Sequence, residues 1–204
     1  MKMNFNYNEI LSRNLAFLKV DDVFTEEECL QIIEAGQMAG LEDSLISDGS
    51  GSDAIRKSKS SFLRPFDNNL WFFERIMSAA NWANELFFQF DLYGFSSAQY
   101  TEYGSEGDFY GWHKDLLFNP NAADLQSTIQ SRKLSASVIL SHRDEYLGGE
   151  FHVERDPENN AVTAIPQNIG SIIFFPSFVD HQVTPVTYGT RKSLVIWIEG
   201  PKFK

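Results

Sequence analysis

The spacing of apolar residues changes character near Asp91, a little before the middle of the chain. Before this point, Thr25–Glu28 has the sequence of a capping box and predicts a helix from about Thr25 to Ala39. Further apolar residues at helical spacing predict a second helix over about 70–90. The residues expected to form the buried faces are Leu30, Ile32, Ile33 and Met38 in the first helix, and Leu70, Phe73, Ile76, Met77, Ala80, Ala83, Phe87 and Phe88 in the second.

After Asp91, short runs rich in β-branched and aromatic residues recur between glycine, proline, asparagine and aspartate. One of them alternates Ser135, Ser137 and Ile139 with apolar neighbours, which is typical of a strand. About seven such strands indicate a β-sandwich or barrel. We therefore expect one domain over residues 1–204, with mainly helical support over 1–95 and a β core over 96–200.

The segment between the two predicted helices, Glu42 to Ser61, is rich in glycine, serine and aspartate. This composition predicts an exposed loop. The loop is either a simple connection or a lid over a substrate, since long loops in compact domains are often functional.

Composition narrows the function classes. Hydrophobic residues make up 43% of the 204 residues, which excludes a disordered chain. A single cysteine, Cys29, excludes an internal disulfide and a cysteine-rich metal site. The net charge of −11 disfavours nucleic acid as a partner. The chain has neither an apolar N-terminal run nor a stretch of roughly 20 apolar residues, so we expect a cytoplasmic protein with no membrane partner.

Candidate metal chemistry centres on few residues, because the chain has only four histidines. His113 and Asp115 are two residues apart, so on an extended strand their side chains share one face. His181 is the best candidate for a third ligand. Two histidines and one carboxylate form the facial triad of non-haem Fe(II) oxygenases, which leaves coordination positions open. The competing interpretation is a partly exposed histidine beside a solvated aspartate.

Arg191 follows His181 by ten residues, in a run that predicts a strand. If that strand lies beside the one carrying His181, the guanidinium can point into the same cavity and hold a carboxylate through two parallel hydrogen bonds. A metal triad and a carboxylate anchor together describe a 2-oxoglutarate site; a surface salt bridge is the alternative role for Arg191. Of the other histidines, His142 is expected to be solvated, and His152 can face either side of its strand.

Four motifs occur in order between Gln99 and Trp197: QYTEYGSEGDFYGWHKD, RKLSASVILS, YLGGEFHV and GSIIFFPSFVDHQVTPVTYGTRKSLVIW. In sequence and order they resemble the 2-oxoglutarate- and Fe(II)-dependent dioxygenases, specifically the prolyl 4-hydroxylase-like branch. This resemblance implies an α+β, mainly β fold: a double-stranded β-helix, or jelly roll, with N-terminal supporting helices.

The resemblance also implies roles for individual residues. It makes His113, Asp115 and His181 the metal ligands, which would act in catalysis through the bound iron. It makes Arg191 the residue that binds the distal carboxylate of 2-oxoglutarate, and Tyr103 a residue of the cosubstrate pocket. Ser193 and Ser135 are expected on strands that face the cavity. Tyr103 as a core aromatic, and the two serines as packing choices, are the alternatives.

The function implied is hydroxylation of a substrate C–H bond by a peptidyl prolyl 4-hydroxylase-like enzyme. It would use Fe(II), 2-oxoglutarate as cosubstrate and O₂, with ascorbate as a further candidate cofactor, on a peptide or protein substrate. Segments 41–61 and 116–132 are candidate substrate lids. Two alternatives stay open: a dioxygenase acting on a free amino acid, small metabolite or nucleobase, and a non-enzymatic, cupin-like metal-binding module. Oligomeric state is not indicated by the sequence.

Overall fold

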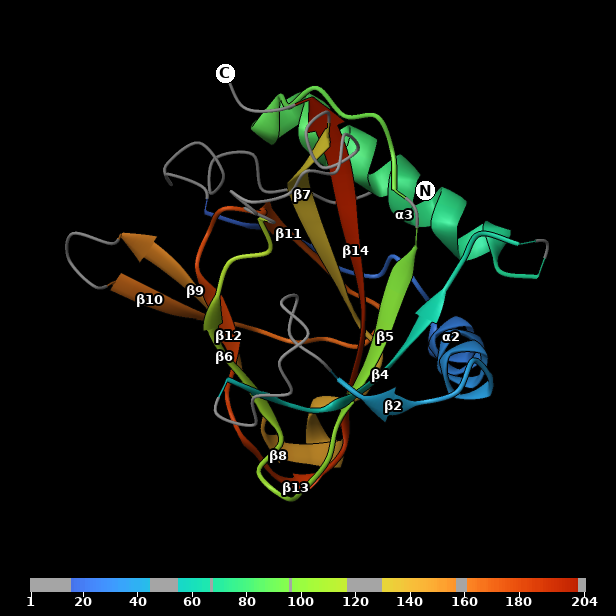
Figure 1. Ribbon diagram of the computed structural model, residues 1–204, viewed down its shortest axis with the longest axis vertical. Coiled ribbons are helices and arrows are strands. Elements are labelled where there is room, and N and C mark those ends of the chain that lie inside the picture. Colours follow the sequence, from blue (N-terminus) through green and yellow to red (C-terminus); the bar gives the residue numbers. More distant parts are fainter. Residues whose placement is uncertain are drawn as a thin grey trace, which may run out of the picture.

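The computed structural model describes residues 16–44, 55–66, 68–95, 97–116, 130–156 and 161–201. Two antiparallel sheets face each other across a narrow interior, and two helices lie on the outside of the larger sheet (Figure 1). This arrangement is a jelly roll with supporting helices, which confirms the predicted fold class.

The larger sheet has seven strands in the order β1-β11-β7-β14-β5-β4-β2, and the smaller has five in the order β10-β9-β12-β6-β3. The strands of the larger sheet are β1 (Leu18–Val20), β11 (Ile172–Pro176), β7 (Gln130–Ile139), β14 (Arg191–Pro201), β5 (Ala98–Tyr103), β4 (Lys59–Leu63) and β2 (Glu42–Asp43). Those of the smaller sheet are β10 (Ala161–Ile165), β9 (Phe151–Asp156), β12 (His181–Val183), β6 (Phe109–His113) and β3 (Arg56–Lys57). A short ribbon of β8 (Tyr146–Gly148) and β13 (Val186–Gly189) lies beside η2 (Arg143–Glu145).

The larger sheet is buried on both faces, which explains the composition of its central strands. On β7, Leu134, Ala136 and Val138 face the helices, while Ser135 and Ser137 face the interior between the sheets. All five are at most 3% exposed. The predicted alternation therefore separates a helix-packing face from a site-facing face, and neither is exposed to solvent.

The two helices form as predicted, with one difference in their buried faces. α2 (Glu26–Met38) begins at Thr25, whose side chain and that of Glu28 form the expected capping box. α3 (Leu70–Ala83) continues into a π-helical turn, η1 (Asn84–Phe88). Leu30 and Met38 of α2 and Leu70 of α3 were expected in the core but are 63%, 81% and 43% exposed. The buried stripe of α2 instead runs through Cys29, Ile32, Ile33 and Gly36.

Gly36 explains how α2 can approach the sheet so closely. A Cβ at this position would lie 2.3 Å from the ring of Tyr100 on β5, so any side chain would push the helix away. The Ser61 hydroxyl on β4 also donates a hydrogen bond of 2.6 Å to the Gly36 carbonyl. Close packing against β5 thus shifts the buried stripe of the helix toward its small residues.

The first half of the chain contributes strands as well as the predicted helices. Residues 16–95 also supply β1, β2 and β4 to the larger sheet and β3 to the smaller one. The segment from Arg56 to Ser61, expected as an exposed loop, is largely strand, and Arg56, Ser58, Ser60 and Ser61 are buried. Its serines hydrogen-bond to neighbouring side chains and backbone, so a polar sequence is accommodated inside the fold.

In the described part of the chain, no helix is long and apolar enough to cross a membrane.

Cys29 should be unreactive toward thiol reagents in the folded protein. Its side chain is fully buried, and burial raises the pKa of the thiol to about 12. At pH 8 only about one molecule in 10,000 carries the reactive thiolate. We expect labelling by 5,5′-dithiobis(2-nitrobenzoic acid) to be at least about 1,000-fold slower in the native protein than in 6 M guanidinium chloride, where it goes to completion. Rapid stoichiometric labelling under native conditions would contradict this packing of α2.

Candidate functional site

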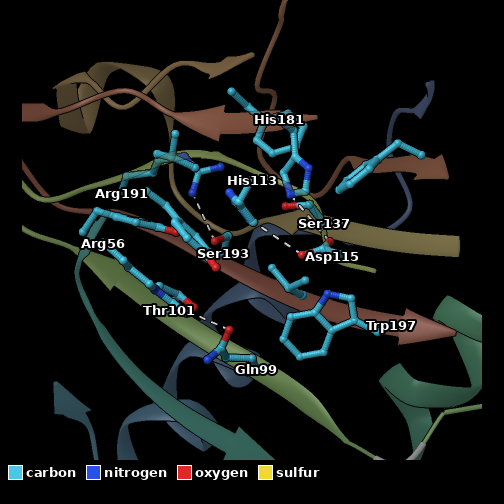
Figure 2. A pocket seen from close by; sticks show the side chains of 16 residues that line it. Arg56, Gln99, Thr101, His113, Asp115, Ser137, His181, Arg191, Ser193 and Trp197 are labelled. Atoms are coloured by element: carbon cyan, nitrogen blue, oxygen red, sulfur yellow. Dashed lines mark hydrogen bonds and ion pairs between the residues drawn. The ribbon is translucent and has the colours of Figure 1, made fainter. Parts of the chain in front are cut away.

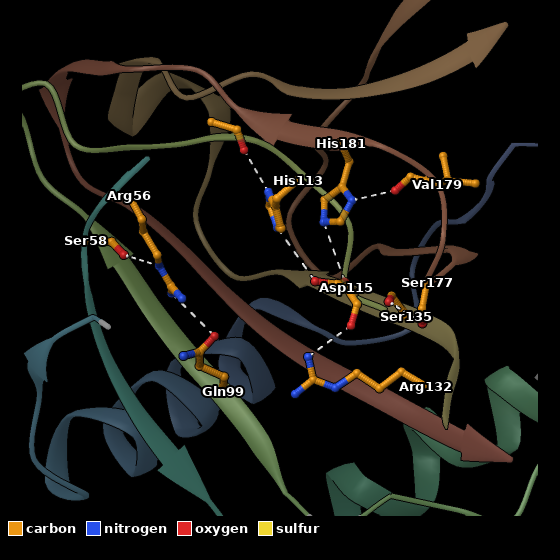
Figure 3. A network of polar contacts seen from close by, with 11 residues as sticks. Arg56, Ser58, Gln99, His113, Asp115, Arg132, Ser135, Ser177, Val179 and His181 are labelled. Atoms are coloured by element: carbon orange, nitrogen blue, oxygen red, sulfur yellow. Dashed lines mark hydrogen bonds and ion pairs between the residues drawn. The ribbon is translucent and has the colours of Figure 1, made fainter. Parts of the chain in front are cut away.

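Three side chains that could hold a metal ion meet where two strands of the smaller sheet pair. His113 ends β6 and His181 begins β12, and the antiparallel register places these two residues directly opposite each other. Asp115 follows β6 by two residues. The potential ligand atoms of the three residues all lie within 4.8 Å of one another. The sequence spacing therefore corresponds to a compact cluster in space (Figure 3).

Backbone carbonyls orient both imidazole rings. Nδ1 of His113 lies 2.8 Å from the Gly111 carbonyl, and Nδ1 of His181 lies 3.0 Å from the Val179 carbonyl. Since a carbonyl only accepts, each Nδ1 carries the proton and donates it. The Nε2 atoms are left as lone-pair donors, 3.7 and 3.6 Å from the two carboxylate oxygens of Asp115. This tautomer is the one in which Nε2 can bind a metal.

The electrostatics of the cluster keep its atoms in the metal-binding form. Burial, followed by the nearby His181, lowers the pKa of His113 to about 3, so its imidazole is neutral at physiological pH. Burial acts to raise the pKa of Asp115, but the neighbouring His181 and His113 outweigh it and hold that pKa below its ordinary value. A neutral imidazole on His113 therefore faces an ionised carboxylate on Asp115.

A divalent cation fits this cluster because one oxygen of the carboxylate lacks a hydrogen-bond partner among the described residues. Oδ2 of Asp115 is buried and has no hydrogen-bond partner among the described residues. A buried carboxylate oxygen without a partner is costly. Two nitrogens and one carboxylate around a common point are also the donor set suited to non-haem Fe(II).

Arg191 lies across the interior from this cluster. Arg191 begins β14 in the larger sheet. From the sequence, this strand could lie beside that of His181, but β14 lies in the opposing sheet. The guanidinium still reaches the same cavity, because the inner faces of both sheets line it. Nε donates to Gln167 at 2.7 Å and Nη1 donates to Ser193 at 3.1 Å.

The remaining nitrogen of Arg191 is unsatisfied. The residue is 1% exposed, and its Nη2 has no hydrogen-bond partner in the described residues; nor does the hydroxyl of Tyr146. Burial lowers the pKa of Arg191, but a guanidinium stays charged in proteins. Gly149 leaves space for the Arg191 side chain, because a Cβ at this position would lie 3.0 Å from Cδ of Arg191. Gly149 also has a φ of +59°, which residues with a side chain rarely adopt. The site fits a ligand carboxylate at this end.

A pocket connects the metal cluster to Arg191 and encloses about 420 Å³ of empty space, counting its open mouth. Figure 2 shows its polar side chains converging from both sheets. The residues that line it are Arg56, Gln99, Thr101, Tyr103, Tyr110, His113, Asp115, Ser137, Phe151, Phe175, His181, Val183, Arg191, Ser193, Val195 and Trp197.

Among the predicted cosubstrate residues, Tyr103 and Ser193 line this pocket, and Ser135 does not. The guanidinium of Arg191 lies 5.4 Å from the centre of the Tyr103 ring. Ser135 is deeper, where its hydroxyl hydrogen-bonds with that of Ser177 at 2.9 Å (Figure 3). Ser137, two residues along the same face of β7, lines the pocket instead.

Sequence reasoning missed Arg56, Gln99, Thr101 and Trp197. Arg56 lies in a segment that the composition predicts as a loop. The alternation of lysine and serine after it is compatible with a strand and could have indicated one. Trp197 lies on the face of β14 that also carries Arg191 and Ser193, so a period of two from Arg191 would have found it. Its buried Nε1 has no hydrogen-bond partner within the described ranges.

The other two histidines lie outside the pocket. His142 is 40% exposed at its side chain and pairs with Glu26. His152 lies on β9 between Phe151 and Val153, whose side chains are buried, and it contacts Glu150 and Gln182 instead. Of the two candidate lids, 45–54 and 117–129 fall outside the described residues, so the lid hypothesis stays a prediction.

Comparison with known proteins is consistent with this geometry. A family model of the 2OG-Fe(II) oxygenase superfamily matches residues 98–199, half of the chain. The chain belongs to the 2OG-Fe(II) oxygenase superfamily. Members of this family use Fe(II) and 2-oxoglutarate, the two groups for which the orphaned Asp115 and Arg191 atoms provide partners.

The individual proteins that this chain resembles are named as hydroxylases. A PKHD-type hydroxylase of Teredinibacter turnerae is 37% identical over 95 residues, which cover 46% of this chain and 38% of that protein. The chain thus spans less than half of this relative's length. A Pseudomonas putida prolyl-4-hydroxylase has a TM-score of 0.68 at 16% identity, covering 96% of this chain and 97% of the other. A Trichoplax adhaerens prolyl hydroxylase, in complex with a hypoxia-inducible-factor peptide fragment, has a TM-score of 0.73 at 17% identity, covering 94% and 87%. These two structures show the same fold.

Proposed function

We propose that this protein is an Fe(II)- and 2-oxoglutarate-dependent dioxygenase that hydroxylates a C–H bond of its substrate. The observation that carries this proposal is that one pocket contains two polar atoms of opposite charge without hydrogen-bond partners among the described residues: a carboxylate oxygen of Asp115 and a guanidinium nitrogen of Arg191. The first requires a cation and the second an anion. A metal-bound 2-oxoglutarate satisfies both.

The metal ligands and the cosubstrate-binding residue lie on opposing sheets of the pocket. His113, Asp115 and His181 would hold the iron on one face and leave the rest of its coordination sphere open. Arg191, positioned by Gln167 and Ser193, would bind the distal carboxylate of 2-oxoglutarate. When bound, iron and 2-oxoglutarate supply the O₂ chemistry that oxidises an unactivated C–H bond. Phe151, Phe175 and other apolar side chains around His181 exclude water from the reacting groups.

A prolyl residue in a peptide or protein is the first substrate to test. The support is the similarity to a PKHD-type hydroxylase and the fold shared with prolyl hydroxylases, one of them in complex with a peptide fragment. Ascorbate is a candidate additive in such assays, since many iron oxygenases need a reductant to keep the metal as Fe(II).

The test is succinate formation from 2-oxoglutarate in air, with Fe(II) and a library of proline-containing peptides. We expect succinate and a substrate product heavier by one oxygen atom, in equal amounts. Chelation of the metal with EDTA should stop both, and fresh Fe(II) should restore them. If the protein binds metal but forms no succinate with any substrate class, a non-enzymatic metal-binding module is the better description.

A further inference from the structure

A second buried arginine lines the pocket and has no role in the chemistry described so far. Arg56 on β3 is 6% exposed. Its side chain crosses from the smaller sheet to the larger one, where Nη2 lies 3.4 Å from Oε1 of Gln99 on β5. Nε donates to the hydroxyl of Ser58 at 2.9 Å. The side chain is therefore held at a fixed place in the pocket wall (Figures 2 and 3).

The charge of Arg56 is not neutralised by the protein. Its hydrogen-bond partners, Ser58 and Gln99, are both neutral, and it forms no ion pair with a carboxylate of the described chain. The guanidinium also lies over the ring of Tyr110, 4.6 Å from its centre. Neutral partners and an aromatic ring orient a guanidinium but do not cancel its charge, and a buried charge without a counter-ion is strongly unfavourable.

Arg56 is close to the reacting centre. The Tyr110 ring that it contacts also stacks on the imidazole of His113, with the ring centres 3.4 Å apart. A single aromatic ring thus contacts both Arg56 and a candidate metal ligand. A ligand group bound to Arg56 would lie on the same side of the pocket as His113, since β3 pairs with β6 in the smaller sheet. Arg191, which would take the cosubstrate, begins a strand of the opposing sheet.

The charges of the pocket lead to the same conclusion. Its lining contains two guanidinium groups, Arg56 and Arg191, and one carboxylate, Asp115. A divalent metal ion and a dianionic 2-oxoglutarate cancel each other. With both bound, the pocket would retain one positive charge, which one further carboxylate would neutralise.

We propose that Arg56 binds a carboxylate of the primary substrate, close to the carbon that is hydroxylated. The substrate class is then an anionic one: a free amino acid, or a peptide with an acidic side chain or its C-terminal carboxylate next to the reacting residue. This inference rests on the proposed function, because it assigns 2-oxoglutarate to Arg191. It explains why an arginine is buried here among neutral partners.

The experiment compares matched ligands that differ only in the carboxylate. Protein loaded with Zn(II), which is redox-inert, and with 2-oxoglutarate is titrated calorimetrically with three pairs. They are L-proline against L-prolinamide, acetyl-Pro-Glu-amide against acetyl-Pro-Gln-amide, and acetyl-Glu-Pro-amide against acetyl-Gln-Pro-amide. We expect the carboxylate member of at least one pair to bind ten times more tightly or better. The pair that shows the preference identifies the source of the carboxylate.

Variants assign the preference to Arg56. Arg56→Gln should make the two members of the preferred pair bind equally, while Arg56→Lys should retain part of the difference. The control is Lys59→Gln, which removes an exposed cation two residues beyond the short strand β3 and should change nothing. Affinity for 2-oxoglutarate should be the same in all four proteins, and thermal melting should show that each is folded.

Two outcomes would overturn the inference. One is that the wild-type protein does not distinguish the members of any pair, including the case in which no probe binds. The other is that Arg56→Gln weakens 2-oxoglutarate binding as much as probe binding, which would place Arg56 in the cosubstrate site. Failure of the proposed function looks different: the Fe(II) protein would form no succinate, while the carboxylate preference measured with Zn(II) persisted.

Discussion

Replacing Asp115 with asparagine should abolish 2-oxoglutarate turnover and weaken Fe(II) binding by more than about 100-fold, since even the loss of a residue that only supports a metal ligand costs 10–100-fold. Asp115 is the carboxylate of the candidate triad, and its Oδ2 has no hydrogen-bond partner among the described residues. Asparagine has nearly the same size and keeps one oxygen, so the substitution removes the charge and little else.

The measurement that isolates this effect is metal-dependent stabilisation of the folded protein. A ligand at 100 times its dissociation constant stabilises the native state by about 2.7 kcal/mol. For Asp115→Asn we expect this stabilisation by Fe(II), added without oxygen, to disappear. Melting of the metal-free variant should be unchanged or slightly higher, because a buried charge is gone.

Asp144→Asn is the matched control, since Asp144 is exposed in the short turn η2. It should bind metal and turn over 2-oxoglutarate like the wild-type protein. Full metal-dependent stabilisation in Asp115→Asn would show that the carboxylate is not a ligand.

The parts of the site that the sequence predicts are those encoded locally. The two-residue spacing of His113 and Asp115, and the strand after Gly189 that carries Arg191, depend on short-range periodicity. The same periodicity placed Ser135 and Ser137 correctly on one face of β7. Which of the two reaches the pocket depends on where the opposing sheet crosses that strand, and this is a tertiary property.

Other features depended on contacts that no local pattern contains. The pairing of β3 with β6 carries Arg56 into the pocket, although its surroundings are serine- and lysine-rich. Leu30 and Met38 are apolar yet exposed, because α2 approaches the sheet through Gly36 instead. Arg191 belongs to the sheet opposite His181, since β14 pairs with β5 and β7. In each case a long-range tertiary contact decided the outcome.

Replacing Arg191 with methionine should separate binding from stability. We expect the affinity for 2-oxoglutarate to fall by at least about 30-fold, because removing one partner of a buried, hydrogen-bonded charge pair costs about 2 kcal/mol or more. The thermal stability of the ligand-free protein should be unchanged or higher, since removing a buried charge whose Nη2 has no partner among the described residues offsets the hydrogen bonds lost to Gln167 and Ser193.

Both effects can be read from one set of melts, with and without 2-oxoglutarate on the Zn(II)-loaded protein. The control is Arg143→Met. Arg143 is an exposed arginine, and its guanidinium lies 4.8 Å from the centre of the Tyr146 ring. That variant should keep its 2-oxoglutarate shift. If Arg191→Met keeps it too, the cosubstrate is held elsewhere, and Arg56 becomes the first candidate. A large loss of ligand-free stability would show instead that Arg191 is mainly structural, held by Gln167 and Ser193 for the fold rather than for a ligand.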